Sequence, residues 1–147
     1  MNEVRIKNLK DLEKFARKFG DELKGGEIIG LIGDLGAGKT TFVQYLAKAL
    51  GVKTAVKSPT FILMQVFETG VVAKKRGAKH LCHVDAYRLK DTAELKMIGF
   101  DDYARNKKTV CLVEWADRTP EIRLYQGYRE LSFGFGLDEE RVIKVSK

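Results

Sequence analysis

A glycine-rich segment near residue 35 constrains the fold of this chain more than any other feature. Residues 33–40, G-D-L-G-A-G-K-T, match the pattern G-x-x-x-x-G-K-[ST] without a gap. An apolar run over 28–32 precedes the segment and a helical pattern over 39–50 follows it. This strand–loop–helix context is the one that a phosphate-binding loop requires, and it argues against a chance match in a glycine-rich turn.

Each residue type in this loop has a physical role toward phosphate. Glycines let the backbone wrap closely and aim its N–H groups at phosphate oxygens, and the start of the next helix adds its positive dipole end. The Lys39 ammonium suits the β- and γ-phosphates, and the Thr40 hydroxyl suits Mg²⁺. A site that binds nucleotide without hydrolysing it remains an alternative. The residues expected to bind nucleotide are Gly33, Asp34, Leu35, Gly36, Ala37, Gly38, Lys39, Thr40 and Thr41.

Two carboxylates stand at the ends of apolar runs, where a phosphate-loop enzyme needs an acid to hold Mg²⁺ or to orient water. Asp85 follows residues 81–84, and Glu114 follows residues 110–113 and fits the Walker-B pattern more cleanly. The segment Ser58-Pro59-Thr60 lies between the loop's helix and the next strand, where many such enzymes sense the γ-phosphate. A turn made rigid by proline is an equally good interpretation of that segment.

Alternating helical and strand patterns predict an α/β fold: a three-layer P-loop NTPase-like domain on a mixed, mainly parallel sheet, with a C-terminal β-hairpin. The length of 147 residues fits one domain over 1–147. Gly20 is expected to end the first helix. Residues 71–73 are expected to be extended and 74–79 to form a basic turn. The expected helices cover 8–19 and 39–50, with short ones from 91 to 99 and from 119, and the expected strands cover 27–32, 61–68, 81–86, 109–115, 129–135 and 141–145.

Charge, hydropathy and cysteine content limit the cellular location and the partners expected for this chain. The net charge of +7 allows an anionic partner without requiring one. No run approaches the ~20 apolar residues that span a bilayer, and the first residues lack the apolar core of a signal peptide. With Cys82 and Cys111 as the only cysteines, we expect a cytoplasmic protein with no membrane contact. His80 and His83 flank Cys82 but point to opposite faces of a strand, which argues against a zinc site.

Four motifs in order resemble one family. They are G-D-L-G-A-G-K-T-T at 33–41, S-P-T-F at 58–61, H-V-D-A-Y-R-L at 83–89 and E-W at 114–115. Together they resemble the TsaE family, bacterial ATPases of tRNA threonylcarbamoyladenosine biosynthesis, over about residues 8–145. The chain departs from the usual family pattern at Phe67 and Ala116 and in a longer segment over 69–79.

The resemblance implies roles beyond those that the residue types alone suggest. It implies that the chain binds ATP and Mg²⁺, with Thr40 and Glu114 as the metal ligands. It implies that the catalytic residues are Lys39, Asp85 and Thr60, and that Thr60 belongs to a switch-like loop. It also implies TsaB and TsaD as partner proteins. TsaD transfers the threonylcarbamoyl group to adenosine 37 of tRNA, so contact of this chain with tRNA is expected to be indirect.

Two other functions remain open. A small-molecule kinase on the same core needs an acceptor pocket and a lid, and the 33 residues after Glu114 leave little room for a lid. A nucleotide-gated binding module would act by contact rather than by turnover. The basic cluster over 74–79 has no aromatic residue within it to stack a base, which favours a solvated or protein-facing surface.

Overall fold

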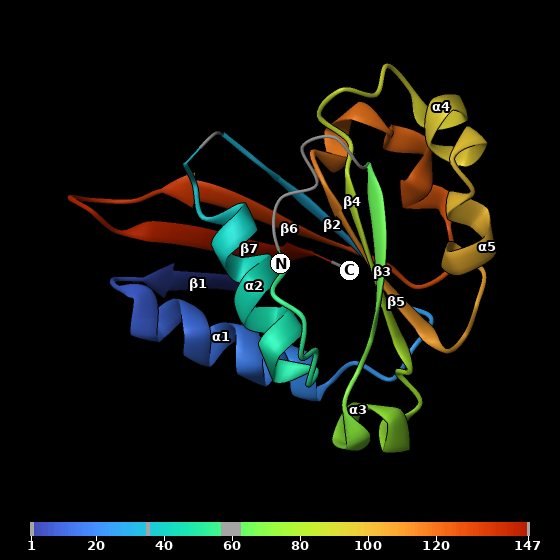
Figure 1. Cartoon of the computed structure of the whole chain (residues 1–147). Coiled ribbons are helices and arrows are strands. Elements are labelled where there is room, and N and C mark those ends of the chain that lie inside the picture. Colours follow the sequence, from blue (N-terminus) through green and yellow to red (C-terminus); the bar gives the residue numbers. More distant parts are fainter. Residues whose placement is uncertain (1, 35, 57–62, 147) are drawn as a thin grey trace.

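A seven-stranded mixed sheet organises the described part of the chain (Figure 1). The computed structural model describes residues 2–34, 36–56 and 63–146. The strand order is β1-β7-β6-β2-β5-β4-β3, in which β6, β2, β5 and β4 are parallel and the other three strands run antiparallel to their neighbours. The predicted α/β fold with a mixed sheet and a C-terminal hairpin is therefore confirmed. The strands are β1 (Asn2–Ile6), β2 (Ile28–Gly33), β3 (Met64–Glu68), β4 (His80–Asp85), β5 (Thr109–Glu114), β6 (Tyr128–Phe135) and β7 (Arg141–Ser146).

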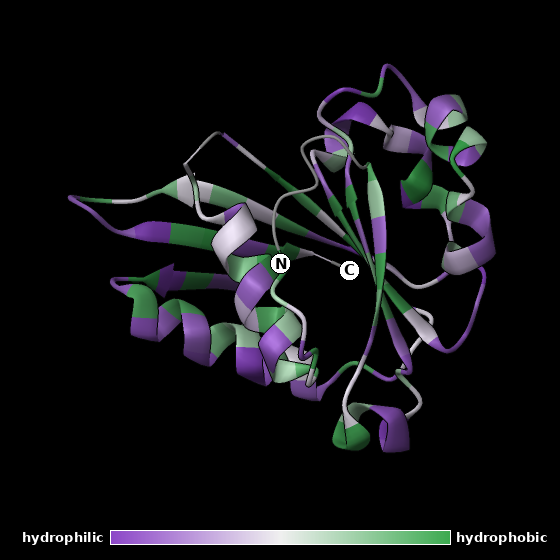
Figure 2. Ribbon diagram, viewed as in Figure 1, coloured by the Kyte–Doolittle hydropathy of each residue, from purple (hydrophilic) through white to green (hydrophobic). Residues whose placement is uncertain are grey.

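Helices cover both faces of the sheet (Figure 1). On one face lie α1 (Leu9–Asp21) and α2 (Lys39–Ala49); on the other lie α4 (Thr92–Met97), α5 (Phe100–Ala104) and the 3₁₀ turns η1 (Ala116–Arg118) and η2 (Pro120–Leu124). Alternate side chains of β2 face the two sides of the sheet. Ile29 belongs to the core under α1 and α2, and Ile28 belongs to the core under α4 and α5. Figure 2 shows hydrophobic residues along the central strands and hydrophilic residues recurring on α1. None of the helices in the described ranges is long and apolar enough to cross a membrane.

The first helix continues past the residue expected to end it. Asn8 caps the helix by accepting the N–H of Asp11 at 2.9 Å, as the sequence predicts, but Gly20 lies inside α1. A Cβ atom on Gly20 would lie 3.1 Å from Leu46 Cδ1 and 3.3 Å from Ala49 Cβ. The prediction of Gly20 as a terminator is wrong, since this glycine allows α1 and α2 to pack closely instead.

A leucine at this contact is expected to destabilise the fold. Gly20→Leu should lower the free energy of unfolding by about 1–3 kcal/mol, because the added side chain has to push α1 away from α2. Urea denaturation followed by circular dichroism measures the change. Lys10→Leu, on an exposed position of the same helix, is the control and should change stability little. Equal stabilities of the two variants would show that the α1–α2 contact tolerates bulk.

The segment over 71–79 differs from the expectation. Residues 71–76 form a short helix, α3 (Val71–Arg76), which starts after Gly70 and ends at Gly77 with φ of +110°. The extended conformation expected for 71–73 is therefore wrong, because buried Ala73 anchors a helical turn and the exposed valines before it are not strand residues. The expected basic turn over 74–79 is wrong in the same way, since three of its cations form the last turn of α3.

Two cations of this segment have structural contacts. Arg76 donates from Nη2 to the carbonyl oxygen of Gly20 at 3.2 Å and from Nε to that of Leu23 at 3.4 Å, which ties α3 to the end of α1. Lys74 pairs with Glu68 at 3.3 Å on the surface. The cluster is thus not uniformly solvated.

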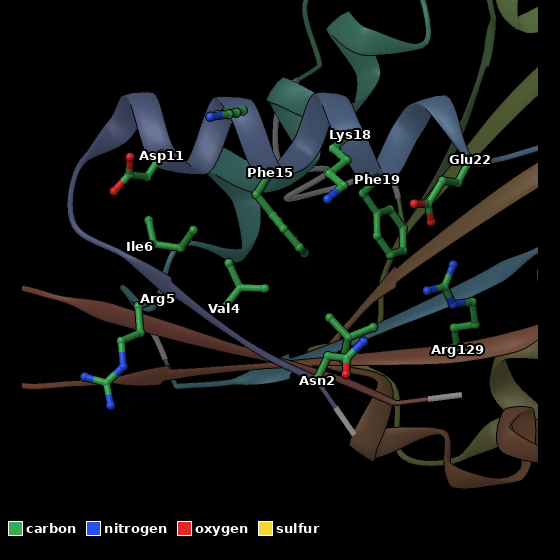
Figure 3. Close-up of a pocket in the computed structure, with 12 residues that line it drawn as sticks. Asn2, Val4, Arg5, Ile6, Asp11, Phe15, Lys18, Phe19, Glu22 and Arg129 are labelled. Atoms are coloured by element: carbon green, nitrogen blue, oxygen red, sulfur yellow. The ribbon is translucent and has the colours of Figure 1, made fainter.

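A cavity of about 450 Å³ lies between α1 and the sheet edge formed by β1 (Figure 3). Phe15 and Phe19 from the helix and Val4 from the strand line its apolar part, and Lys18 and Arg129 contribute charge. A second cavity of about 980 Å³ includes Gly25 to Glu27, which precede β2. None of the described loop residues, 33–34 and 36–40, lines either of these two cavities.

Candidate nucleotide-binding site

The candidate site lies where three parallel strands end. Gly33 closes β2, Asp85 closes β4 and Glu114 closes β5. The register places Asp85 opposite Glu114, and Glu114 opposite Leu31. Ligands of open α/β sheets bind beyond the carboxyl ends of such strands. The sheet therefore brings the predicted loop and both predicted acids to one edge.

The phosphate loop has the backbone that its glycines allow. The φ angles of Gly33, Gly36 and Gly38 are +138°, +77° and +101°, a region that other residues adopt with strain. A Cβ atom on Gly33 would lie 2.3 Å from the carbonyl oxygen of Phe133, so this position has no room for a side chain. Helix α2 then begins at Lys39, as predicted from the sequence. Leu35 lies outside the described residues.

The Lys39 side chain is buried at the loop, with only 5% of the residue exposed. Its ammonium donates a hydrogen bond to the carbonyl oxygen of Gly33 and lies 3.5 Å from the centre of the Trp115 ring. Burial lowers the pKa of Lys39 below its usual value, and four neighbouring carboxylates act in the opposite direction. Those carboxylates belong to Glu114, Asp117, Asp34 and Asp85.

Glu114 is held at both of its oxygens. The Thr40 hydroxyl donates to Oε1 at 3.0 Å, and His83 donates from Nε2 to Oε2 at 2.6 Å. Glu114 is 3% exposed and His83 is fully buried. Nδ1 of His83 has no hydrogen-bond partner among the described residues. These contacts orient the carboxylate of Glu114 before any ligand binds.

His83 is the site residue that reasoning from the sequence missed. That reasoning considered it only as a metal ligand, yet the histidine instead positions Glu114. The available signal was strand alternation: residues 83 and 85 share one face of β4, and the parallel neighbour β5 presents Glu114 on that same side.

The remaining predicted residues are placed as follows. Asp85 Oδ1 accepts the N–H of Tyr87 at 3.0 Å, which turns this carboxylate toward the segment after β4. Thr41 lies in the first turn of α2. Thr60, with the rest of the S-P-T-F motif, lies outside the described residues.

An aromatic pair borders the loop. The Trp115 and Tyr87 rings lie 5.0 Å apart at their centres, and the Arg118 guanidinium lies 4.9 Å from the centre of the Tyr87 ring. Trp115 has φ of +58°, a left-handed backbone that costs a residue other than glycine about 1–3 kcal/mol and that clusters at functional sites. The expectation that β5 extends through residue 115 is therefore wrong, because the chain turns sharply after Glu114.

The donor atoms at this edge suit Mg²⁺. The Thr40 hydroxyl and the Glu114 carboxylate are hard oxygen ligands 3.0 Å apart. Mg²⁺ is usually held by one or two protein oxygens together with substrate phosphates and water. Within the described ranges, no group of three or more His, Cys, Asp or Glu side chains is placed to hold a metal ion.

Comparison with known proteins decides the family. The model of the family "Threonylcarbamoyl adenosine biosynthesis protein TsaE" matches residues 6–142. The chain belongs to the TsaE family. The resemblance carried by the four motifs is thus confirmed, and the match includes the loop, both acids and the hairpin strand β6.

Individual TsaE proteins agree with this assignment. The chain is 37% identical over 124 residues to the "tRNA threonylcarbamoyladenosine biosynthesis protein TsaE" of Bacillus subtilis, covering 82% of this chain and 72% of that protein. It is 42% identical over 120 residues to the protein of the same name from Aquifex aeolicus, covering 80% and 79%. The crystal structure of YdiB from Bacillus subtilis superposes with a TM-score of 0.73 at 30% identity, covering 99% of this chain and 84% of that one.

Proposed function

We propose that this TsaE family member is a Mg²⁺-dependent ATPase that supports threonylcarbamoylation of adenosine 37 in tRNA, together with TsaB and TsaD. The observation that carries the proposal is the 3.0 Å hydrogen bond between the Thr40 hydroxyl and Glu114. It joins the end of the phosphate loop to the acid of the neighbouring strand, the pair that holds the metal in P-loop nucleotide hydrolases.

Each residue of the site has a distinct role in this proposal. Backbone N–H groups of residues 34–41 and the Lys39 ammonium bind the phosphates and offset their charge. Asp85 orients the attacking water, and Thr60 belongs to a loop that responds to the γ-phosphate. Thr40 and Glu114 hold Mg²⁺, and His83 keeps Glu114 in position. When bound, the ion would offset part of the negative charge of the phosphates.

The reaction is an in-line displacement. A water oxygen forms a bond to the γ-phosphorus while the bond from that phosphorus to the β–γ bridging oxygen breaks, which yields ADP, inorganic phosphate and a proton. The whole of 1–147 acts as one ATPase domain in this proposal. TsaD carries out the transfer to tRNA, so this chain's contact with tRNA is indirect.

Reconstituted modification tests the proposal. Purified TsaB, TsaD, the threonylcarbamoyl donor and substrate tRNA are incubated with this chain and ATP, and modified adenosine is measured over many turnovers. We expect ATP to support repeated turnover, and a non-hydrolysable analogue or the Lys39→Ala variant not to support it. Full modification with the analogue would instead favour a nucleotide-gated binding module. A phosphorylated small molecule as the product would favour a kinase.

The basic segment is expected to contribute little to tRNA binding by the isolated chain. The triple variant Lys74→Ser, Lys75→Ser and Lys79→Ser should leave basal ATP hydrolysis unchanged, because none of these residues lines the phosphate loop. Arg76 is retained, since it holds α1 through two carbonyl oxygens. Binding to a substrate tRNA and to a non-substrate tRNA is measured across salt concentration. Tight binding that is selective for the substrate tRNA and lost in the triple variant would contradict an indirect contact.

A further inference from the structure

Arg118 stands at the end of η1, four residues after Glu114, and shares an aromatic neighbour with the phosphate-loop lysine. Its guanidinium lies 4.9 Å from the centre of the Tyr87 ring and 6.0 Å from that of Trp115. The Lys39 ammonium lies 3.5 Å from the centre of the same indole. Both cations therefore lie within 6.0 Å of one ring, at the edge where β2 and β5 end.

The guanidinium of Arg118 is held by rings rather than by carboxylates. Within 2–34, 36–56 and 63–146, its side chain makes no ion pair and no hydrogen bond. Two other arginines differ, since Arg123 is paired with Glu130 at 2.8 Å and Arg105 lies 3.7 Å from Asp101, whereas Arg129 likewise lies over a ring, 4.8 Å from the centre of Phe19. Stacking holds a guanidinium in place while leaving its N–H donors available, and their planar arrangement suits phosphate oxygens.

When a triphosphate binds at this edge, negative charges outnumber positive ones, so a further cation would stabilise the complex. Four carboxylates act electrostatically on the Lys39 ammonium, those of Glu114, Asp117, Asp34 and Asp85. A nucleoside triphosphate adds about four negative charges, and Mg²⁺ offsets only two of them. A phosphate-binding arginine beside the terminal phosphate reduces this repulsion, most of all as charge redistributes during transfer.

We propose that Arg118 is a catalytic residue that contacts the γ-phosphate of bound ATP, so that the chain supplies its own arginine finger. The Tyr87 and Trp115 rings hold the guanidinium beside the loop by stacking. The short turn η1 then presents it to the phosphate from the segment that follows the metal-binding acid. This inference rests on the proposed ATPase function and adds the residue that discriminates ATP from ADP.

Three variants test this role. Arg118→Ala removes the cation, and Arg118→Lys keeps the charge without the planar donor set. Arg105→Ala is the matched control, because Arg105 also stacks on a tyrosine, 5.3 Å from the centre of the Tyr125 ring, but lines the cavity that includes the residues before β2. Thermal unfolding establishes that each variant is folded. Arg118 and Arg105 are both exposed, so we expect little change in stability.

We measure kcat and KM for ATP, and the Kd values of a non-hydrolysable ATP analogue and of ADP. Arg118→Ala should lower kcat by about 100-fold or more, because removal of an arginine finger typically costs a large factor in turnover. It should weaken binding of the analogue at least about tenfold while leaving ADP binding unchanged, because only the triphosphate carries the contacted group. Arg118→Lys should recover only part of kcat. ADP with aluminium fluoride, which mimics the transferring phosphoryl group, should be captured by the unaltered chain and by Arg105→Ala but not by Arg118→Ala.

Equal losses of ATP-analogue and ADP affinity would overturn the proposal, because they would place Arg118 at the base or at the inner phosphates. Unchanged kcat with normal capture of aluminium fluoride would overturn it as well. Failure of the ATPase function has a different signature: the unaltered chain would then hydrolyse no more ATP than Lys39→Ala does. In that case the difference between analogue and ADP affinity still decides whether Arg118 contacts the γ-phosphate.

Discussion

Replacing Lys39 with alanine is expected to lower ATP hydrolysis by about 100- to 1000-fold, the usual effect of removing one group that stabilises charge in the transition state. The ammonium is the cation inside the phosphate loop, where its neighbours are the Gly33 carbonyl and the Trp115 ring. Burial already lowers the pKa of Lys39, so the free protein holds this charge at a cost that phosphate oxygens would offset. The loss therefore falls on nucleotide binding and turnover rather than on folding.

Phosphate release with saturating Mg²⁺ measures the effect, and circular dichroism confirms the fold. Lys48→Ala is the matched control, because Lys48 lies in the last turn of the same helix and is exposed. Turnover of Lys39→Ala equal to that of the control would remove the basis for a functional phosphate loop.

Substitutions of the two acids, Glu114 and Asp85, are expected to impair the reaction in different ways. Glu114→Gln should raise the Mg²⁺ concentration needed for nucleotide binding and lower turnover by about 100-fold, since it removes a metal-ligand charge. Its carbonyl oxygen can still accept from Nε2 of His83, with the new NH2 group facing the Thr40 hydroxyl, so the contact with the buried histidine is retained. Asp85→Asn should lower turnover by a similar factor and spare nucleotide affinity, because its proposed role is toward water.

Titration of Mg²⁺ against a bound fluorescent nucleotide separates the two roles. Asp102→Asn, an exposed acid on α5, serves as the control for loss of one negative charge. The same shift of the Mg²⁺ dependence in Glu114→Gln and Asp85→Asn would refute these separate roles and assign both carboxylates to the metal.

The parts of the site that could be predicted are those encoded over short distances along the chain. The loop over 33–40, the helix that begins at Lys39 and the acids at the ends of two strands all follow from local patterns of glycine, charge and apolar residues. The hydrogen bond between His83 and Glu114 depends on the register of β4 against β5, which no local pattern determines. Likewise, the stacking of Arg118 requires β4 and β5 to place Tyr87 beside Trp115.

Errors in the fold have similar physical causes. Two valines at 71–72 favour a strand by intrinsic preference, but glycines on both sides allow a helical turn that buries Ala73. The edge strand β1 has only Val4 and Ile6 facing the core, too few residues for a clear alternation. Residue type alone predicts that Gly20 ends a helix, whereas its role comes from packing against Leu46 on a different helix.

The order of the strands also has a consequence for the synthesis of this protein. Strand β2, which leads into the phosphate loop, is flanked by β5 and β6, and β6 ends at Phe135. Strand β1 pairs with β7, so Asn2 lies opposite Val145. A growing chain on the ribosome therefore exposes an unpaired edge of β2 until residues 128–135 have emerged, and β1 has no partner strand until β7 follows. Contacts of such long sequence separation slow folding. Loss of the last two strands would remove a neighbour of β2 where the loop begins, because Phe133 of β6 pairs with Gly33.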